Sequence, residues 1–356
     1  MKKNIFKDDY NLKSLLKIKT KTGNLPMYVT PRYRLHYLKN KYEPFSVTVI
    51  RNLIKPKNTF LDIGAHYGFF SLVVHQQQPS TNIIAIEAVK KNCQVLEKNF
   101  KLNSIKNYTV HCQAVSAKKE SKNFFITNAS DSSGFSPHSQ AKAIRKKQII
   151  TATVDHLVKN LTIDLIKIDV EGHELAVIRG GQNTIKKFHC PLIIEFNPSC
   201  QLLAGHSPQQ LLKLLDKLGY NLFVIGENTQ KLYLIDTPIN NWINIIGVDN
   251  FFKRSTYFNL LCLKKNTYQK NSFIKKNLRL ISKSMNQNYI FKKLYQQQQN
   301  EARLHLEFRK QYNLIRKELT KTQQEYDKTR KLLFFTQKKL DKTYKAYLNL
   351  INQPQK

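Results

Sequence analysis

The fold of this chain is decided by residues 60–70, which read FLDIGAHYGFF. An apolar strand is predicted to end there at an acidic residue, Asp62, and to continue through a Gly-x-x-x-Gly turn, Gly64 to Gly68, into a helix. Glycines let the backbone approach a ligand closely, and a helix start offers free N–H groups. The turn lacks the GxGxxG spacing of dinucleotide sites and the lysine of a P-loop, so a diphosphate ligand is not favoured.

A second acidic residue ends the next predicted strand, residues 84–87, IAIE. A carboxylate at this place, Glu87, can accept hydrogen bonds from both hydroxyls of a ribose, as in the nucleoside half of a Rossmann-like site. Taken together and in this order, the two motifs predict an adenosine-containing ligand without a pyrophosphate.

A third motif, residues 164–175, reads DLIKIDVEGHEL. It predicts a strand that carries Asp169 at its carboxyl end, where ligands bind in open α/β sheets. A carboxylate is costly there unless something in the cleft uses it. Glu171 and Glu174 fall in the first turn of the following helix, where the helix dipole stabilises negative charge. That structural role is the favoured interpretation for Glu174.

Short apolar runs alternate with amphipathic ones between residues 56 and 263, which predicts a mainly parallel, seven-stranded α/β sheet. Asn128–Lys147 is Ser-rich and then basic, and is predicted to be a loop over one end of the sheet. The predicted strands are Thr59–Ile63, Ile83–Glu87, Tyr108–Val115, Leu165–Asp169, Leu192–Phe196, Leu222–Ile225 and Phe258–Leu263. The predicted helices are Phe69–His75, Lys91–Asn103, Glu174–Lys187 and Pro208–Leu218.

Three regions are predicted: an N-terminal helical lead-in over residues 1–55, the α/β domain over 56–263, and a basic helical tail over 264–356. The tail carries 23 Lys+Arg against 6 Asp+Glu. From Phe308 onward it shows a heptad repeat, which predicts a coiled coil; a long helix folded back onto the domain is the alternative. One seam is Tyr312, Leu319, Tyr326, Leu333, Leu340 and Tyr347, and the other is Ile315, Thr322, Thr329, Thr336, Thr343 and Leu350.

Composition excludes several classes of protein. Hydrophobic residues make up 41% of the chain, too many for a disordered protein. The five cysteines are scattered and never form CxxC, so neither a disulfide framework nor a zinc module is expected, and a reducing cytosol fits best. The sequence shows no signal peptide and no apolar run long enough to span a membrane. A cytoplasmic protein is expected, with association at the inner face of a membrane left open.

The chain carries 59 Lys+Arg and 24 Asp+Glu, a net charge of +35. Only 11 of the basic residues are arginine, and the lysines are dispersed along the chain. Arginine reads guanines and stacks on bases, whereas dispersed lysine mostly solvates a surface. Charge alone therefore does not favour a nucleic-acid-binding protein.

At this point the sequence resembles the FkbM family of S-adenosylmethionine-dependent methyltransferases, over residues 57–198. The resemblance rests on residues 60–65 (FLDIGA), 85–87 (AIE), 153–157 (TVDHL), 164–172 (DLIKIDVEG) and 193–195 (IIE). It implies a class I, Rossmann-like methyltransferase domain. It also implies S-adenosylmethionine as cofactor and, as acceptor, a hydroxyl of a sugar, a glycolipid or polysaccharide, or another small metabolite.

The resemblance also implies the positions of the cofactor-binding residues. His66 stands where the family usually has Asn, and Ala88 where it usually has Pro; both would lie beside the cofactor. The methionine half would be lined by Asp62, Gly64, Ala65 and Gly68, the ribose held by Glu87, and the adenine flanked by Gln113 and Ala114.

Methyl transfer needs an oxygen nucleophile and a group to take its proton. Asp169 is predicted to be this base, with Glu171 and His173 holding the acceptor hydroxyl or sharing its proton. His66 is a weaker candidate base. A divalent metal held by Asp169 and Glu171 is an alternative, but two carboxylates and a histidine on one short segment fall short of a metal signature, so no metal is expected. Glu195 and Asn197 are predicted to shape the acceptor pocket.

Two other functions remain open. An RNA or DNA methyltransferase would use the basic tail to bind nucleic acid, and Asn197-Pro198 resembles part of the loop of amino-group methyltransferases. A non-catalytic coiled-coil scaffold is the second alternative. The expected partners are a small-molecule or glycan acceptor, a second copy of the chain through the coil, and an anionic membrane surface.

Overall fold

The computed structural model describes residues 12, 15–38, 42–127, 133–136, 143–227, 229–234 and 258–280. The chain divides into two compact units, residues 1–292 and 293–356, and every described residue belongs to the first. The predicted coiled coil over residues 308–351 therefore lies outside the described residues.

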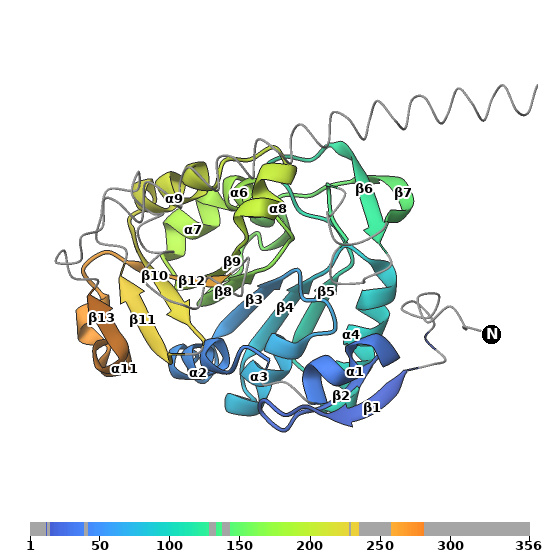
Figure 1. The fold of residues 1–356 in the computed structure, drawn as a ribbon, viewed down its shortest axis with the longest axis horizontal. Helices are drawn as coiled ribbons and strands as arrows, with labels where there is room; N and C mark the ends of the chain where they lie inside the picture. Colours follow the sequence, from blue (N-terminus) through green and yellow to red (C-terminus); the bar gives the residue numbers. More distant parts are fainter. Residues whose placement is uncertain are drawn as a thin grey trace, which may run out of the picture. The chain divides into compact units, whose positions relative to one another are not determined.

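A nine-stranded sheet is the framework of the first unit (Figure 1). Five of its eight neighbouring strand pairs are parallel, and β12 and β10 run antiparallel to their neighbours. The strand order is β13-β11-β10-β12-β9-β8-β3-β4-β5. In chain order the strands are β3 (Thr59–Ile63), β4 (Asn82–Ile86), β5 (Tyr108–His111), β8 (Leu165–Ile168), β9 (Leu192–Phe196), β10 (Tyr220–Gly226), β11 (Lys231–Leu234), β12 (Phe258–Lys264) and β13 (Leu278–Leu280).

All seven predicted strands are present, so the predicted α/β fold with a mainly parallel sheet is confirmed. The predicted number of strands was too small, because β11 and β13 extend the sheet at one edge. Both are short, four and three residues, and each contains a charged residue, so neither produces a clear apolar run. The sheet thus continues beyond Lys264, where the tail was predicted to begin.

Helices cover both faces of the sheet (Figure 1). Because β8 and β9 are buried between these layers, nearly every residue in them is apolar. Among the described residues, no helix is both long and apolar enough to cross a membrane. One face carries α6 (Glu174–Gly180), α7 (Gln182–Phe188), α8 (Pro198–Leu203) and α9 (Pro208–Lys217). The other face carries α1 (Pro31–Leu38), α2 (Pro44–Leu53), α3 (Phe69–Gln77) and α4 (Lys90–Leu102). Two further short helices are α5 (Val154–Leu157) and α11 (Ser272–Asn277).

The single helix predicted over Glu174–Lys187 is wrong: the structure breaks it into α6 and α7 at Gly181. The break lies where the chain packs tightly. A Cβ on Gly180 would be 2.1 Å from the Ser116 carbonyl oxygen, and one on Gly181 would be 3.2 Å from the Val154 side chain. Close packing against Ser116 therefore accounts for the glycine at the end of α6, which periodicity could not reveal.

The loop predicted over Asn128–Lys147 ends inside a strand. β6 (Ser121–Thr127) and β7 (Ala143–Ile150) form an antiparallel hairpin apart from the main sheet. Arg145 and Lys146 of β7 are exposed, so the strand lacks the apolar face by which a sequence pattern would reveal it.

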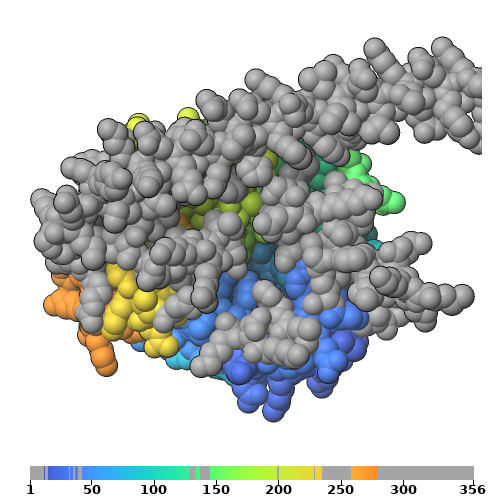
Figure 2. Space-filling model, viewed as in Figure 1, coloured from blue at the N-terminus to red at the C-terminus, as the bar shows by residue number. Residues whose placement is uncertain are grey.

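The N-terminal region contains more than the predicted helical lead-in. A hairpin of β1 (Leu16–Lys19) and β2 (Pro26–Val29) precedes α1 and α2. The hairpin packs on α4, where Asn99 accepts a hydrogen bond from the backbone N–H of Tyr28 at 2.5 Å and donates to its carbonyl oxygen at 3.1 Å. Figure 2 shows this segment, in blue, at the lower surface of the molecule.

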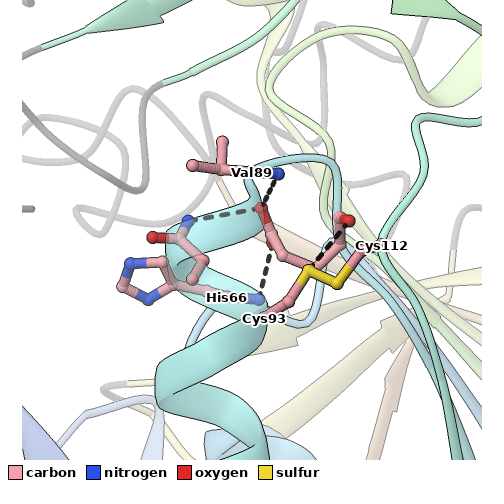
Figure 3. The surroundings of a disulfide bond; sticks show 6 residues. His66, Val89, Cys93 and Cys112 are labelled. Carbon is pink, nitrogen blue, oxygen red and sulfur yellow. Dashed lines mark hydrogen bonds between the residues drawn. A yellow bond between two sulfur atoms is a disulfide. The ribbon is translucent and has the colours of Figure 1, made fainter. Parts of the chain in front are cut away.

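One pair of cysteines is joined, although the scattered cysteines did not predict a disulfide framework. Cys93, in α4, forms a disulfide with Cys112, which follows β5 (Figure 3). The two are 19 residues apart in sequence, but the β4–α4–β5 unit brings their Cα atoms within 6.1 Å. Cys190, Cys200 and Cys262 are buried thiols that are not part of this disulfide.

Candidate active site

The acidic motifs meet at one edge of the sheet. Ile63 of β3 pairs with Ile86 of β4 on one side and with Ile168 of β8 on the other, and Ile168 pairs with Ile194 of β9. The residues that follow these positions include Glu87, Asp169 and Glu195. Motifs far apart in sequence are thus brought together at the carboxyl ends of neighbouring strands, where ligands bind in this class of fold.

The turn after β3 requires its first glycine. Gly64 has φ +79°, and a Cβ there would lie 1.7 Å from the carbonyl oxygen of Asp169. The N–H groups of Gly64 and Ala65 donate to the Ile86 carbonyl oxygen at 2.8 and 3.1 Å. Gly68, at φ +83°, precedes the first residue of α3. Gly64 therefore allows the β3 turn to lie directly against the end of β8.

Asp62 joins the end of β3 to α3. Its buried carboxylate accepts a hydrogen bond from the Ser71 hydroxyl at 2.6 Å. Burial raises the pKa of Asp62 to about 6, although the bond from Ser71 opposes the shift. This side chain fixes the geometry of the turn that follows it.

Glu87 is buried at the end of β4 and accepts three hydrogen bonds (Figure 3). The donors are the backbone N–H groups of His66 and Val89, each at 2.9 Å, and the Asn92 side-chain amide at 3.2 Å. Burial raises the pKa of Glu87 to about 7, and the hydrogen bonds partly oppose this shift. A carboxylate offers about four acceptor positions, so one remains for a ligand.

The His66 ring is held by aromatic residues. It stacks on Tyr67 at 3.7 Å between ring centroids and meets Tyr33 of α1 edge-on at 5.1 Å. The residue has φ +49°, a left-handed conformation that places its N–H on Glu87. The N-terminal segment therefore contributes directly to this side of the site, which sequence reasoning missed.

The predicted adenine-side residues, Gln113 and Ala114, follow the disulfide-bonded Cys112. The Gln113 side chain donates to the carbonyl oxygen of Ile150 at 3.4 Å, and the Ala114 carbonyl oxygen accepts from the N–H of Ala152 at 2.9 Å. The end of the β6–β7 hairpin thus lies beside these two residues.

Asp169 is partly exposed, with 24% of its side chain accessible, and is ion-paired with a lysine that sequence reasoning overlooked. Lys167 Nζ lies 2.9 Å from Asp169 Oδ2, and only 1% of the lysine side chain is exposed. Burial by itself lowers the pKa of Lys167, but nearby carboxylates, led by Asp169 and Glu43, outweigh it and raise the pKa above its ordinary value. A lysine inside the apolar run LIKI was the available signal, because a buried lysine is normally paired.

Of the two residues predicted to assist Asp169, the structure brings Glu171 to it. Oxygen atoms of Asp169, Glu171 and Glu195 all lie within 4.8 Å of one another. Glu171 has φ +53°, in the tight turn between β8 and α6. Its side chain also receives a contact from Cys200 Sγ at 3.7 Å.

His173, the other predicted assistant, is buried in a separate setting. Its Nε2 lies 3.0 Å from the Ser116 hydroxyl, and its ring contacts Phe135 and His206. Burial, with the charges of Lys122 and His206, lowers the pKa of His173 to about 3. At neutral pH His173 is therefore a neutral ring. It contacts Ser116, Phe135 and His206, and its catalytic role stays a prediction.

Glu174 has the structural role favoured for it from sequence. It is fully buried and accepts hydrogen bonds from the N–H of Gly172 at 2.9 Å and from the Gln201 amide at 3.3 Å. The side chain thereby fixes the turn that carries Glu171.

Comparisons with known proteins relate part of this chain to one family of methyltransferases. Residues 62–222 match the family described as Methyltransferase FkbM domain. "Methyltransferase sdnD" of Sordaria araneosa is 29% identical over 201 residues, which cover 47% of this chain and 75% of that protein.

Two solved structures are also similar. The methyltransferase FkbM from Methylobacillus flagellatus has 16% identity and a TM-score of 0.38, covering 59% of this chain and 44% of that one. A SAM-dependent O-methyltransferase from Thermotoga maritima has 12% identity and a TM-score of 0.34, covering 74% and 71%. This chain thus spans less than half of the FkbM structure.

Proposed function

We propose that the chain, whose residues 62–222 match the FkbM methyltransferase domain, uses S-adenosylmethionine to methylate a hydroxyl oxygen of a sugar, a glycolipid or polysaccharide, or another small metabolite. One observation carries the proposal. Asp169 lies partly exposed at the carboxyl end of β8, in contact with the β3 turn at Gly64. This places a carboxylate able to accept a proton beside the turn predicted to bind the cofactor.

The residues present fit the cofactor. A Cβ on Gly64 would collide with backbone, so the loop is built for close approach, and Glu87 keeps one acceptor position for a ribose hydroxyl. Its longest bond, from Asn92 at 3.2 Å, is the easiest to exchange for a second hydroxyl. Bound there, the cofactor supplies an electrophilic methyl group on a sulfonium. The β3 turn would hold its methionine half and Glu87 its ribose.

In this proposal Lys167 positions Asp169, and Asp169 accepts the proton. Lys167 holds Asp169 through Oδ2, which leaves Oδ1 to accept the proton of the acceptor hydroxyl. The oxygen that loses this proton would form the new bond to the methyl carbon as the sulfur–methyl bond breaks, which leaves the demethylated cofactor as a thioether. Positioning and proton removal of this kind account for a large part of the rate of such reactions.

A nucleic-acid acceptor is less well supported. An enzyme that methylates the amino group of a base must read that group with a free amide or carbonyl. The Asn197 side chain instead accepts a hydrogen bond from the N–H of Cys200 at 3.1 Å and caps α8. Asn197, which suggested a nucleic-acid methyltransferase, therefore uses its side-chain oxygen to cap α8.

We expect Glu87→Ala to weaken binding of S-adenosylmethionine by about ten- to a hundredfold, because loss of a buried hydrogen-bonding carboxylate costs about 1.5–3 kcal/mol. Isothermal titration calorimetry on both proteins measures the change. Glu97→Ala, on the exposed face of α4, is the control and should bind normally. Unchanged affinity in Glu87→Ala would remove Glu87 from the cofactor site.

Cofactor affinity should also depend on pH through the same residue. Since burial raises the pKa of Glu87 to about 7, its charged form, the better acceptor for ribose hydroxyls, increases as pH rises through 7. Affinity should therefore increase from pH 6 to pH 8, by up to about tenfold, and then level off. Calorimetry at several pH values tests this, and Glu87→Gln should flatten the profile. A wild-type profile that falls with pH would contradict it.

We also propose that the basic tail brings the enzyme to an anionic surface as an oligomer, because its net charge and heptad repeat predict both. The test is a protein ending at Lys292, which keeps β13 and α11 in place. It should be monomeric by light scattering, bind cofactor normally and lose salt-sensitive adsorption to anionic vesicles. The same oligomeric state and the same adsorption as the full chain would contradict this role of the tail.

A further inference from the structure

Three carboxylates converge at the carboxyl ends of two neighbouring parallel strands. Asp169 follows β8, Glu195 lies in β9, and Glu171 belongs to the turn after β8. Each contributes an oxygen, and these oxygens all lie within 4.8 Å of one another. We propose that Asp169, Glu171 and Glu195 bind a hard divalent cation, to which Glu195 brings a third carboxylate that sequence spacing did not associate with the other two.

The second observation concerns Glu195. Its side chain is 8% exposed, and its Oε2 atom is buried without a hydrogen-bond partner. A buried carboxylate oxygen left unpaired is costly, because it has lost water and gained nothing in exchange. Glu195 belongs to the same group of oxygens as Asp169 and Glu171, so a cation among them would supply the missing partner.

The local charge is consistent with a divalent ion. Lys167 pairs with Asp169 through Nζ and Oδ2 at 2.9 Å. If the three side chains bind as carboxylates, the Lys167 ammonium offsets one of their negative charges, and a divalent cation would offset the other two. Since Lys167 engages Oδ2, Asp169 can bind the ion through one acceptor position of Oδ1 and keep the other for the proton of the acceptor hydroxyl.

The donor atoms and their spacing select the kind of ion. Oxygen ligands alone suit Mg²⁺, Mn²⁺ and Ca²⁺ rather than the softer metals that prefer thiolate or imidazole. Oxygens on opposite sides of Ca²⁺ at about 2.4 Å lie about 4.8 Å apart, and around Mg²⁺ about 4.2 Å apart. The oxygen atoms of the three carboxylates all lie within 4.8 Å of one another, which is the limit for Ca²⁺.

What the cation site implies for the class of acceptor rests on the proposed function, because it assumes that the chain methylates a hydroxyl group. A cation at this edge would lie where the acceptor must bind, and its remaining positions would be filled by water or by substrate oxygens. An acceptor with two adjacent hydroxyls, such as the vicinal diol of a sugar, offers two oxygens at the right spacing. The site would therefore favour vicinal diols over isolated alcohols.

The test is direct binding of Mn²⁺ to the untagged full-length protein from which metals have been removed with a chelator. Binding is measured by electron paramagnetic resonance, in which the signal of free Mn²⁺ decreases as the ion binds. We expect one saturable Mn²⁺ per chain, displaced by Mg²⁺ or Ca²⁺. Glu195→Gln and, separately, Glu171→Gln should each weaken binding by at least about tenfold. Glu43→Gln is the matched control: it removes a carboxylate that interacts electrostatically with Lys167 and Asp169 but is not one of the three ligands. The affinity of Glu43→Gln for Mn²⁺ should be within about threefold of the wild-type affinity.

Circular dichroism on each variant verifies folding, and Glu171, the more exposed of the two ligands, provides the second variant if Glu195→Gln does not fold. Absence of saturable Mn²⁺ binding to wild type, or unchanged affinity in the folded ligand variants, would overturn the proposal. Calorimetry with S-adenosylmethionine on the same samples separates the two claims. Normal cofactor binding without Mn²⁺ binding refutes the cation site alone, whereas Mn²⁺ binding without cofactor binding refutes the proposed function.

Discussion

Replacing Asp169 with asparagine is expected to lower the rate of methyl transfer by about 10²- to 10⁴-fold, because the amide keeps the shape of the carboxylate but cannot take a proton. Binding of S-adenosylmethionine should be nearly unchanged, since the residues predicted to hold it lie in the β3 turn and at the end of β4. Single-turnover kinetics with a saturating acceptor measures the first quantity, and calorimetry the second.

The structure provides a comparison for this result. Asp62 is a buried carboxylate of the same site, but its bond to Ser71 gives it a structural role. Asp62→Asn should therefore lower the free energy of unfolding and cofactor affinity rather than the rate of the chemical step. If Asp169→Asn turned over at the wild-type rate, Asp169 would be structural, and His66 or His173 would be the next base to test.

Replacing Lys167 with methionine is expected to lower the free energy of unfolding by about 3 kcal/mol or more, the penalty for removing one partner of a buried ion pair. Lys167 is 1% exposed and lies 4.7 Å from the Phe70 ring centroid as well as beside Asp169. Methionine fills a similar volume and leaves the neighbouring carboxylates without a cation. Urea unfolding followed by circular dichroism measures the loss.

A matched control is present in the same chain. Lys265 pairs with Asp216 at 2.7 Å, but the two side chains are 46% and 50% exposed. An exposed pair contributes about 0–1 kcal/mol, so Lys265→Met should change stability little. If Lys167→Met and Lys265→Met lowered the free energy of unfolding equally, burial of the Lys167–Asp169 ion pair would not increase its contribution to stability.

The loss in Lys167→Met should also vary with pH. Without the lysine, the carboxylates around it repel one another when ionised, and protonation relieves that repulsion. The stability difference from wild type should therefore be larger at pH 8 than at pH 5. A difference that is independent of pH would indicate that Lys167 acts through packing alone.

The order of motifs along the chain was enough to predict the central sheet. Strands such as β3 and β9 are continuous apolar runs with an acid or a glycine at the carboxyl end, and their predicted bounds agree with the structure. Parallel strands buried on both faces have this pattern because no face meets water. The same logic placed Asp62, Glu87 and Asp169 at one edge.

Features that depend on tertiary contact were not predictable in this way. The β1–β2 hairpin is held to α4 by Asn99, and α2 is capped by Glu227, which accepts hydrogen bonds from the N–H groups of Phe45 and Ser46 at 2.7 and 2.9 Å. Each partner lies more than seventy positions away in sequence. Periodicity reports local structure, so it carries no information about such pairs.

The same limit applied within the candidate site. Glu195 was predicted to shape the acceptor pocket, but its proximity to Asp169 and Glu171 depends on the pairing of β8 with β9. His173 lies two residues from Glu171 in sequence, yet its ring bonds to Ser116. Sequence spacing thus identified the segment that carries the chemistry but not which of its side chains point toward one another.

The most direct test of the central claim is transfer of a labelled methyl group. The full-length protein would be incubated with methyl-labelled S-adenosylmethionine and separate pools of sugar lipids, polysaccharide, small metabolites and RNA, with Asp169→Asn in parallel. The account predicts label in a sugar or small-metabolite pool, as an alkali-stable methyl ether, and little with the variant. Label confined to RNA, or equal labelling by Asp169→Asn, would contradict it.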